Sequence, residues 1–350
     1  MKKLFKFFVL FVPVLIFAQT STSSQDVIKG LSLQNELIKN SIVKNIKFQN
    51  IGPSVMSGRV SDIEVNPNNP KEFYVAYASG GLWHTVNNGN TFVSVFENAD
   101  TQNIGDFAVD WTTGLIIVGT GENNSSRSSY AGIGILKSID NGENWTNIGL
   151  TDSHHIGKVK INPENNEEII VGVIGHLYSK NSQRGVFKTI DGGKTWQKTL
   201  YIDDNTGVID VDIDSQDFNI QFASSWTRDR SSWNFNGNGK KSGIYKSIDG
   251  GENWILITTK ESGFPVNDGN GRIGVSVFDK NLIYAIVDNQ SRRPILNPLE
   301  EKEKGINKNI FEKMSVAEFN KLNDMDLNKF LVNNNFPKQY DAITVKKLVK

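Results

Sequence analysis

The chain of 350 residues contains no cysteine. This excludes disulfides, catalytic thiols, thiolate metal sites and a lipidated N-terminal cysteine. Charge of one sign is not in excess either, because 38 Lys and Arg residues balance 38 Asp and Glu residues. No basic stripe with interleaved aromatic residues is present, so nucleic acid is not an expected partner. Beyond the first eighteen residues no apolar run is long enough to span a bilayer, and helical heptads are absent from the central region.

The N-terminus has the pattern of a secretory signal peptide. Three lysines at positions 2, 3 and 6 precede an apolar run from Phe7 to Phe17, and Ala18 follows. This order of a basic, an apolar and a small residue predicts a signal peptide over residues 1–18. We therefore expect a secreted, periplasmic or cell-surface protein with no transmembrane segment after cleavage. The alternative is an uncleaved membrane anchor.

One pattern of eight residues occurs four times. It reads Ser/Thr-x-Asp-x-Gly-x-Thr/Asn-Trp and starts at residues 85, 138, 189 and 247, in steps of 53, 51 and 58 residues. A period near fifty residues indicates a repeated supersecondary unit. The first copy departs from the pattern with Asn87 and Phe92, which predicts a looser first unit. The structural residues expected in the other copies are Asp140, Gly142, Trp145, Asp191, Gly193, Trp196, Asp249, Gly251 and Trp254.

The sequence around each copy predicts four short strands. A half-buried apolar segment such as Gly185-Val-Phe-Lys188 precedes the motif, whose Asp-x-Gly centre is typical of a tight hairpin. Further upstream, strands begin with glycine at residues 58, 105, 157, 207 and 271, and a second apolar run follows each. Four strands in a meander every fifty residues are typical of a β-propeller blade. The sequence thus predicts an all-β propeller with four complete blades and the start of a fifth.

The eight-residue hairpin resembles the Asp-box of sialidase-type (BNR-repeat) propellers. With its Gly-Leu-Trp, Gly-Val-Phe-Lys-Thr and Gly-Ile-Tyr-Lys-Ser lead-ins, it is most similar to the sortilin/VPS10-like branch, whose exported bacterial members are often labelled glycosyl hydrolases. The resemblance covers roughly residues 46–290. It implies the fold but not one function, because propellers of this type include enzymes, receptors and assembly factors.

Four regions follow from these patterns. Residues 1–18 are the signal peptide, 19–45 a linker or lead-in helix, 46–298 the blades, and 299–350 a helical insertion or tail. In the last region, Ser315 and Glu318 have the spacing of a capping box. Because an incomplete ring leaves exposed strand edges, we expect the sequence to be a piece of a longer protein. The alternative is a closed ring of four or five blades.

The long, irregular loops are expected on the face opposite the repeated hairpins. They join the second and third strands, at residues 119–132, 175–185 and 224–243. Binding groups usually lie on such loops over a rigid scaffold. The ligand-binding candidates on these loops and at the strand entries are Arg59, Arg127, His155, His176, Trp226, Arg228, Arg230, Trp233 and Arg272.

Each candidate also has a structural interpretation. Arginines stacked on Trp226 and Trp233 order their loop, and Arg59 and Arg272 form ion pairs within the ring. His154, His155 and His176 lie on adjacent blades, but their spacing does not indicate a metal site. We therefore expect no metal and no cofactor.

Two functions from different classes remain open. The first is an exported scaffold that binds extracellular protein, peptide or carbohydrate. The second is a glycoside hydrolase, which needs two carboxylates about 5 Å or roughly 6.5–9.5 Å apart. Asp106 and Glu122 are the catalytic pair for that case, since they lie on neighbouring strands of one blade. A sialidase is disfavoured, because Ser57-Gly-Arg-Val60 stands where such enzymes have Arg-Ile-Pro.

Overall fold

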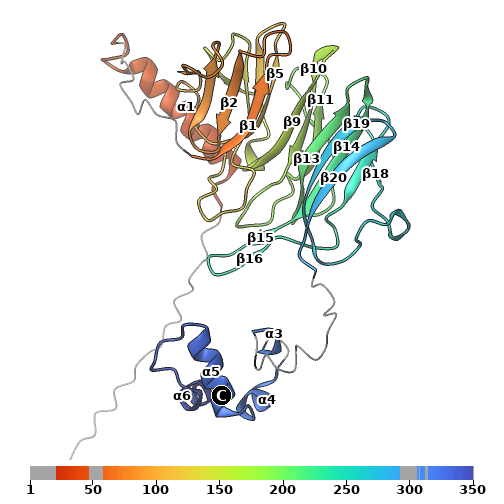
Figure 1. The fold of residues 1–350 in the computed structure, drawn as a ribbon. Coiled ribbons are helices and arrows are strands. Elements are labelled where there is room, and N and C mark those ends of the chain that lie inside the picture. Colours follow the sequence, from red (N-terminus) through yellow and green to blue (C-terminus); the bar gives the residue numbers. More distant parts are fainter. Residues whose placement is uncertain (1–20, 47–57, 292–305, 307, 312–313, 350) are drawn as a thin grey trace, which may run out of the picture. The chain divides into compact units, whose positions relative to one another are not determined.

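The structure is a computed structural model that describes residues 21–46, 58–291, 306, 308–311 and 314–349 (Figure 1). The predicted signal peptide, residues 1–18, lies outside the described residues. The chain divides into two compact units, residues 1–291 and 292–350.

Four antiparallel sheets of four strands follow one another along the first unit, and in each sheet the strands pair in sequence order. The first sheet has β1 (Val60–Val65), β2 (Phe73–Tyr77), β3 (Gly81–Thr85) and β4 (Val93–Ser94). The second has β5 (Ile104–Asp110), β6 (Leu115–Thr120), β7 (Ile135–Ser138) and β8 (Thr146–Asn147). The third has β9 (Ile156–Asn162), β10 (Asn165–Val173), β11 (Gly185–Thr189) and β12 (Gln197–Leu200).

The fourth sheet has β13 (Thr206–Asp214), β14 (Asp217–Thr227), β17 (Ile244–Ser247) and β18 (Ile255–Leu256). A small hairpin of β15 (Asp229–Arg230) and β16 (Phe235–Asn236) extends from it, and the short turns η1 (Thr151–Ser153) and η2 (Lys260–Ser262) connect sheets. A two-stranded sheet of β19 (Asn270–Asp279) and β20 (Leu282–Asn289) follows. The strands confirm four complete blades and the first two strands of a fifth.

The first strands of the five sheets lie next to one another in chain order, so they form the inner layer of a β-propeller (Figure 1). Apolar side chains fill the space between successive sheets. One such cluster joins Ile117 and Ile135 of the second sheet to Val159 and Val171 of the third. Burial of these faces drives the sheets together, because each sheet has an apolar side that water would otherwise cover.

The repeated motif forms the turn between the third and fourth strands of each four-stranded sheet. In the second copy, Asp140 Oδ1 accepts hydrogen bonds from Ser138 Oγ at 2.7 Å and from the Asn144 amide at 2.9 Å. The Gly142 amide donates to Ser138 Oγ at 2.9 Å, and Gly142 has the positive φ of 93° that this tight turn requires. The third and fourth copies make the same bonds. The motif is therefore a hairpin-stabilising device.

The aromatic residue that ends the motif links neighbouring blades. The indole nitrogen in each of the last three copies donates to the preceding blade, in the pairs Trp145 with Val95 O (2.9 Å), Trp196 with Ile148 O (2.8 Å) and Trp254 with Thr199 Oγ1 (3.1 Å). In the first copy, Asn87 Oδ1 still accepts from the Thr91 amide at 3.0 Å. Phe92 has no such donor. The first blade thus keeps its hairpin bonds and lacks the indole link.

Replacing Trp196 with phenylalanine is expected to lower the free energy of unfolding by about 1 kcal/mol. The change keeps most of the ring but removes the bond that joins the third blade to the second. Urea unfolding followed by circular dichroism measures the effect. Trp233→Phe is the control, because Trp233 is 86% exposed and donates no hydrogen bond to the described residues. Equal midpoints for both variants would contradict the assignment of a linking role to the indole.

Acid is expected to weaken the hairpins. Hydrogen bonds from the residue four positions on lower the pKa of Asp140 and Asp249 to about 2. The same kind of bonds, from Thr195, also lower the pKa of Asp191. A carboxyl whose pKa is lowered on folding stabilises the fold above its unfolded pKa of about 3.9. This stability is lost as the pH falls from about 4 toward 2. Melting temperatures should drop over that range and drop less when all three are changed to asparagine. If the triple variant loses melting temperature with falling pH as steeply as the unaltered chain, the three aspartates are not the cause of the acid sensitivity.

Glycines at the start of the inner strands allow the blades to approach closely. A Cβ on Gly105 would lie 2.1 Å from Ile156 O of the next blade. On Gly207 it would lie 2.2 Å from Ile174 O of the preceding blade. Both neighbours are backbone atoms that cannot swing aside. At Gly105 and Gly207 the repeated glycine is therefore required by contact between blades.

Charged side chains join the inner strands. Lys158 Nζ lies 2.8 Å from Asp106 Oδ1 and 3.7 Å from Asp62 Oδ2. Burial by itself lowers the pKa of Lys158, but the two carboxylates outweigh burial, so the pKa is raised. The second oxygen of Asp106 accepts the Val159 amide at 2.8 Å. Asp106 thus satisfies the edge of the adjacent strand β9, which would otherwise leave an unpaired N–H.

The helices lie at the two ends of the described chain. Helix α1 (Ser24–Asn40) falls in the predicted lead-in segment and buries no residue. The second unit contains α3 (Lys308–Phe311), α4 (Val316–Asn320), α5 (Asp324–Asn333) and α6 (Ala342–Leu348). The predicted capping box of Ser315 and Glu318 begins α4. Leu327, Leu331 and Ala342 form a small core of their own. The C-terminal segment is therefore helical, as the sequence predicts.

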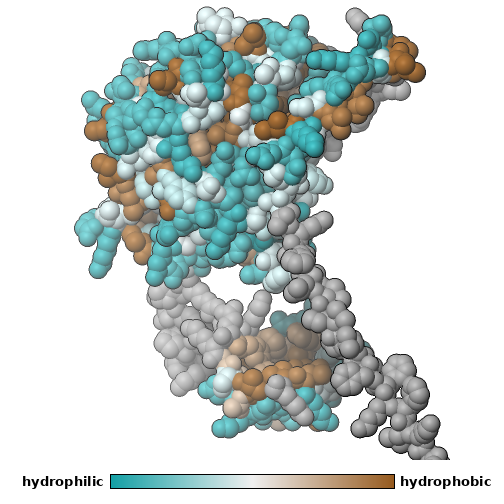
Figure 2. Space-filling model, turned by 180° about the vertical axis from the view of Figure 1, so that it is seen from behind, coloured by the Kyte–Doolittle hydropathy of each residue, from teal (hydrophilic) through white to brown (hydrophobic). Residues whose placement is uncertain are grey.

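Surface hydropathy differs between the two units. Viewed as in Figure 2, the propeller surface is mostly hydrophilic with scattered apolar residues, and the C-terminal unit presents a band of apolar side chains. Within the described residues, no helix has the length and apolar character needed to cross a membrane.

Candidate functional site

Side chains from four blades converge on one short segment of the second blade, Glu122–Ser125, which we call the hub loop. It follows β6 and begins the first of the three long loops. Because antiparallel strands alternate in direction, these loops lie at the opposite end of each sheet from the repeated hairpins. The Asn123 amide group anchors the hub loop by donating to Gly105 O at 2.9 Å. The sequence predicts the long loops on this face but not their convergence.

Glu122 takes part in more hydrogen bonds than any other residue of the hub loop. Its carboxylate accepts two hydrogen bonds of 2.6 Å from Arg59 Nε and Nη2, and one of 3.2 Å from Asn124 Nδ2. Burial by itself raises the pKa of Glu122, but the hydrogen bonds, that from Arg59 foremost, outweigh it and lower the pKa. His155 Nδ1 lies 2.8 Å from Glu122 O. The first and third blades thus hold the hub loop of the second, and Arg59 forms the ion pair expected of it.

Three arginines reach the hub loop from the fourth and fifth blades. Arg228 Nη1 donates to Ser125 Oγ at 2.7 Å, and Arg230 Nη1 donates to Ser125 O at 2.7 Å. Arg272 Nη1 donates to Asn124 Oδ1 at 2.8 Å. The guanidinium of Arg228 also lies 5.5 Å from the ring centre of Trp226. Arg228 and Trp226 therefore order the loops, as their structural interpretation predicts.

This cluster has positive charge without a carboxylate partner. Among the described residues, Arg228, Arg230 and Arg272 form no salt bridge, although Arg228 is fully buried. Burial, and then the nearby charges of Arg184 and Arg272, hold the pKa of Arg228 well below its usual value. The Nε atoms of Arg228 and Arg230 are buried and have no hydrogen-bond acceptor among the described residues. Three guanidinium groups without a carboxylate partner create positive potential at this face of the propeller.

Each long loop also presents at least one exposed aromatic side chain. Tyr130 is 57% exposed, Tyr178 52% and Trp233 86%. Tyr178 Oη donates to Arg127 O at 3.4 Å, so the first and second long loops touch at their tips. Exposed Tyr and Trp next to Arg have the composition of a recognition surface. Of the predicted ligand-binding residues, Arg127 and Trp233 are thus accessible, whereas His155, Trp226 and Arg228 are buried.

Both proposed catalytic carboxylates are buried and already have hydrogen-bond partners. Asp106 is 2% exposed and Glu122 is fully buried. Asp106 binds Lys158 and the Val159 amide, whereas Glu122 binds Arg59 and Asn124. Burial raises the pKa of Asp106, opposed by the charge of Lys158. These contacts favour the structural interpretation of each side chain, and their catalytic role stays a prediction.

The histidines separate into two environments. His155 turns toward the hub loop, whereas His154 and His176 stack with ring centres 3.5 Å apart. Asp152 lies beside this pair, and its Oδ1 is 3.3 Å from His176 Nε2. Burial lowers the pKa of His154 to about 4 and also lowers that of His176. Asp152 is not among the residues predicted from the sequence, although it precedes His154 by only two positions.

Comparisons with known proteins assign no family and no activity to the chain. No protein-family model matches the chain, and no curated protein sequence matches it. Similar solved structures include a GH74 enzyme from Niastella koreensis, with 21% identity over 65% of this chain and 35% of that one and a TM-score of 0.46. The GH74 xyloglucanase from Xanthomonas campestris is 15% identical over 65% of this chain and 35% of that one, with a TM-score of 0.44. The chain thus spans about a third of the length of these two enzymes.

A structure of YCF48 from Cyanidioschyzon merolae is similar over more of its own length. It is 15% identical over 69% of this chain and 70% of that one, with a TM-score of 0.41. At these levels of similarity, neither the enzymes nor YCF48 assigns an activity to this chain.

Proposed function

We propose that this chain is an exported propeller scaffold that binds extracellular protein, peptide or carbohydrate through its loop face. The observation that carries the proposal is the set of exposed aromatic side chains, Tyr130, Tyr178 and Trp233, one on each long loop. They surround loops that the buried arginines hold in place. The N-terminal signal pattern supports export, and the hairpin motif supports membership of the Asp-box, sortilin-like propellers.

The binding surface is preorganised by contacts beneath it. Arg228 and Arg230 connect the third long loop to the hub loop through hydrogen bonds to Ser125. Because Arg228 is fully buried, its side chain has few alternative conformations. Binding to a loop face that is already rigid costs less conformational entropy than binding to loops that must first become ordered. Trp233 contributes a large apolar surface at its edge, and Arg127 contributes charge. Such a surface suits recognition and needs no catalytic group.

Trp233→Ala is expected to weaken ligand capture about 30-fold, which corresponds to about 2 kcal/mol, without changing the melting temperature. Arrays of extracellular polysaccharides and of peptides identify the ligand, and titration calorimetry measures its affinity. Ile139→Ala is the matched control, because Ile139 is 74% exposed and lies on the hairpin face. A variant that loses stability but keeps its affinity would show that the Trp233 loop is structural.

Glycoside hydrolysis is the alternative, and it depends on Asp106 and Glu122. A panel of aryl glycosides tests it directly, with Asp106→Asn and Glu122→Gln as the altered enzymes. If the chain hydrolyses a substrate and either change abolishes turnover while the fold is retained, the hydrolase alternative replaces the scaffold proposal. Equal turnover in both variants would exclude this pair as the catalytic residues.

A further inference from the structure

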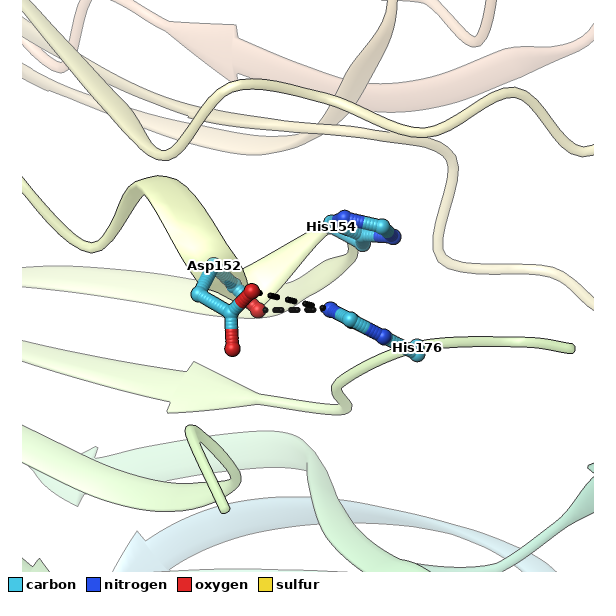
Figure 3. Close-up of side chains that lie close together, drawn as sticks. All are labelled: Asp152, His154 and His176. Carbon is cyan, nitrogen blue, oxygen red and sulfur yellow. Dashed lines mark hydrogen bonds and ion pairs between the residues drawn. The ribbon is translucent and has the colours of Figure 1, made fainter. Parts of the chain in front are cut away.

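A cluster of Asp152, His154 and His176 lies apart from the hub contacts described above. Asp152 belongs to the turn η1, His154 follows it, and His176 lies in the loop after β10. One ligand atom from each of the three lies within 4.8 Å of the others. In Figure 3 the carboxylate and the carbonyl of Asp152 both point to the same ring nitrogen of His176, and the His154 ring lies over that ring.

The His176 ring is held in one orientation. Its Nδ1 lies 2.7 Å from Ser179 Oγ, and its backbone oxygen accepts a bond of 2.6 Å from Arg184. The Nε2 atom faces Asp152, at 3.1 Å from the backbone oxygen and 3.3 Å from Oδ1. A histidine whose outer nitrogen bonds to a polar group while its inner nitrogen faces other ligand atoms has the arrangement of a metal ligand.

The backbone holds His154 in a rare conformation. Leu150 and His154, which bound the turn η1, both have φ of 54° although neither is glycine. Backbone strain of this kind persists only where the surrounding structure enforces it, and it is frequent at functional sites. Neither ring nitrogen of His154 has a hydrogen-bond partner among the described residues. The strained turn therefore places an unpaired imidazole over His176.

We propose that Asp152, His154 and His176 bind a divalent transition-metal ion of the Zn²⁺ class. Two imidazole nitrogens and one carboxylate oxygen suit Zn²⁺ better than Ca²⁺ or Mg²⁺, which take oxygen ligands. With three protein ligands, the fourth position of a tetrahedral ion is left for water. The site shares the second long loop with Tyr178 of the proposed binding face, because His176 and Ser179 lie on either side of that residue. It also departs from the expectation of no metal drawn from the sequence.

Binding requires two small rearrangements. The rings of His154 and His176 are nearly parallel, at 18°, so the half-buried His154 ring must rotate for both nitrogens to meet one ion. That ring has no hydrogen bond to break. His176 remains neutral and shifts its proton from Nε2 to Nδ1, and the Ser179 hydroxyl then accepts from Nδ1 while Nε2 donates its electron pair to the ion. The nearby Arg184 charge opposes a cation, and the Asp152 carboxylate offsets it.

Titration calorimetry of the untagged full chain with zinc sulfate tests the proposal. We expect one Zn²⁺ per chain and a higher melting temperature when the ion is bound. Ser179→Ala should weaken affinity about 10- to 100-fold through loss of the outer hydrogen bond. His154→Ala removes a ligand at a half-buried position and should weaken it at least as much.

His84→Ala is the matched control, because His84 pairs with Glu72 in the first blade and lies outside the cluster. It should leave Zn²⁺ affinity unchanged. The absence of saturable Zn²⁺ binding overturns the proposal. An affinity that His154→Ala leaves unaltered, or that His84→Ala abolishes, overturns it as well. Should Ser179→Ala fail to fold, the comparison of His154→Ala with His84→Ala still decides the outcome.

Discussion

Replacing Lys158 with methionine is expected to lower the free energy of unfolding by about 3–5 kcal/mol. Methionine keeps much of the length of the side chain but removes the cation that lies between Asp106 and Asp62. Two carboxylates then remain in a site where the Asp106 side chain is only 3% exposed. Breaking one partner of a buried ion pair is costly because the other charge stays without compensation. Urea unfolding at pH 7 measures the change.

The pH dependence of the free energy of unfolding distinguishes loss of the ion pair from simple loss of packing. Burial already raises the pKa of Asp106 in the folded chain, and without the opposing charge of Lys158 that pKa should be raised further. A raised carboxyl pKa contributes stability at low pH that is lost as the pH rises through the folded pKa. The variant should therefore regain stability between pH 7 and 5. Lys240→Met is the control, since Lys240 and Asp268 are 75% and 76% exposed and their pairing contributes less than about 1 kcal/mol. Equal losses in the two variants would falsify the buried-pair assignment.

Gly105→Ala is expected to lower the free energy of unfolding by about 3 kcal/mol or more. The added methyl would lie 2.1 Å from Ile156 O and 2.5 Å from Gly121 O, and both are backbone atoms. Relief of these contacts requires the second and third blades to move apart, which opens the apolar core between them. Thermal and urea unfolding measure the loss, and the loss of the contact between β5 and β9 should also speed hydrogen exchange in both strands.

Gly30→Ala provides the matched control. Gly30 lies inside α1, where an added Cβ meets no atom within 4 Å. This substitution should not lower the free energy of unfolding, because alanine is a better helix former than glycine. If Gly105→Ala is no more destabilising than Gly30→Ala, the close approach between the inner strands is contradicted.

The fold could be predicted from local patterns because each blade repeats the same short-range chemistry. The Asp-x-Gly turns at Asp140 and Asp249 specify hairpins within eight residues, and those hairpins form with the expected bonds. The glycines at the strand starts were also visible as a repeat. The sequence does not show why glycine is needed there, because the contact of Gly105 with Ile156 O joins residues about fifty positions apart.

The candidate site was less predictable because its contacts join distant parts of the chain. The sequence places Arg228 and Arg230 on a long loop and Arg272 at a strand entry of the same face. Nothing in the sequence indicates that all three meet at Asn124 and Ser125, or that Arg228 is buried. Burial depends on how loops from different blades pack, and loop packing has no periodicity to read. Asp152 was missed for the same reason.

The hub loop also bears on how the chain folds. Contacts between adjacent blades can form as each blade is completed, whereas Arg272 and Asn124 are 148 residues apart. Closing so long a segment is entropically unfavourable, so the hub contacts should form after the rate-limiting step. Variants at Arg272 should then leave the folding rate nearly unchanged and increase the unfolding rate. Residues 122–125 would therefore control how long the assembled blades stay folded rather than how quickly they fold.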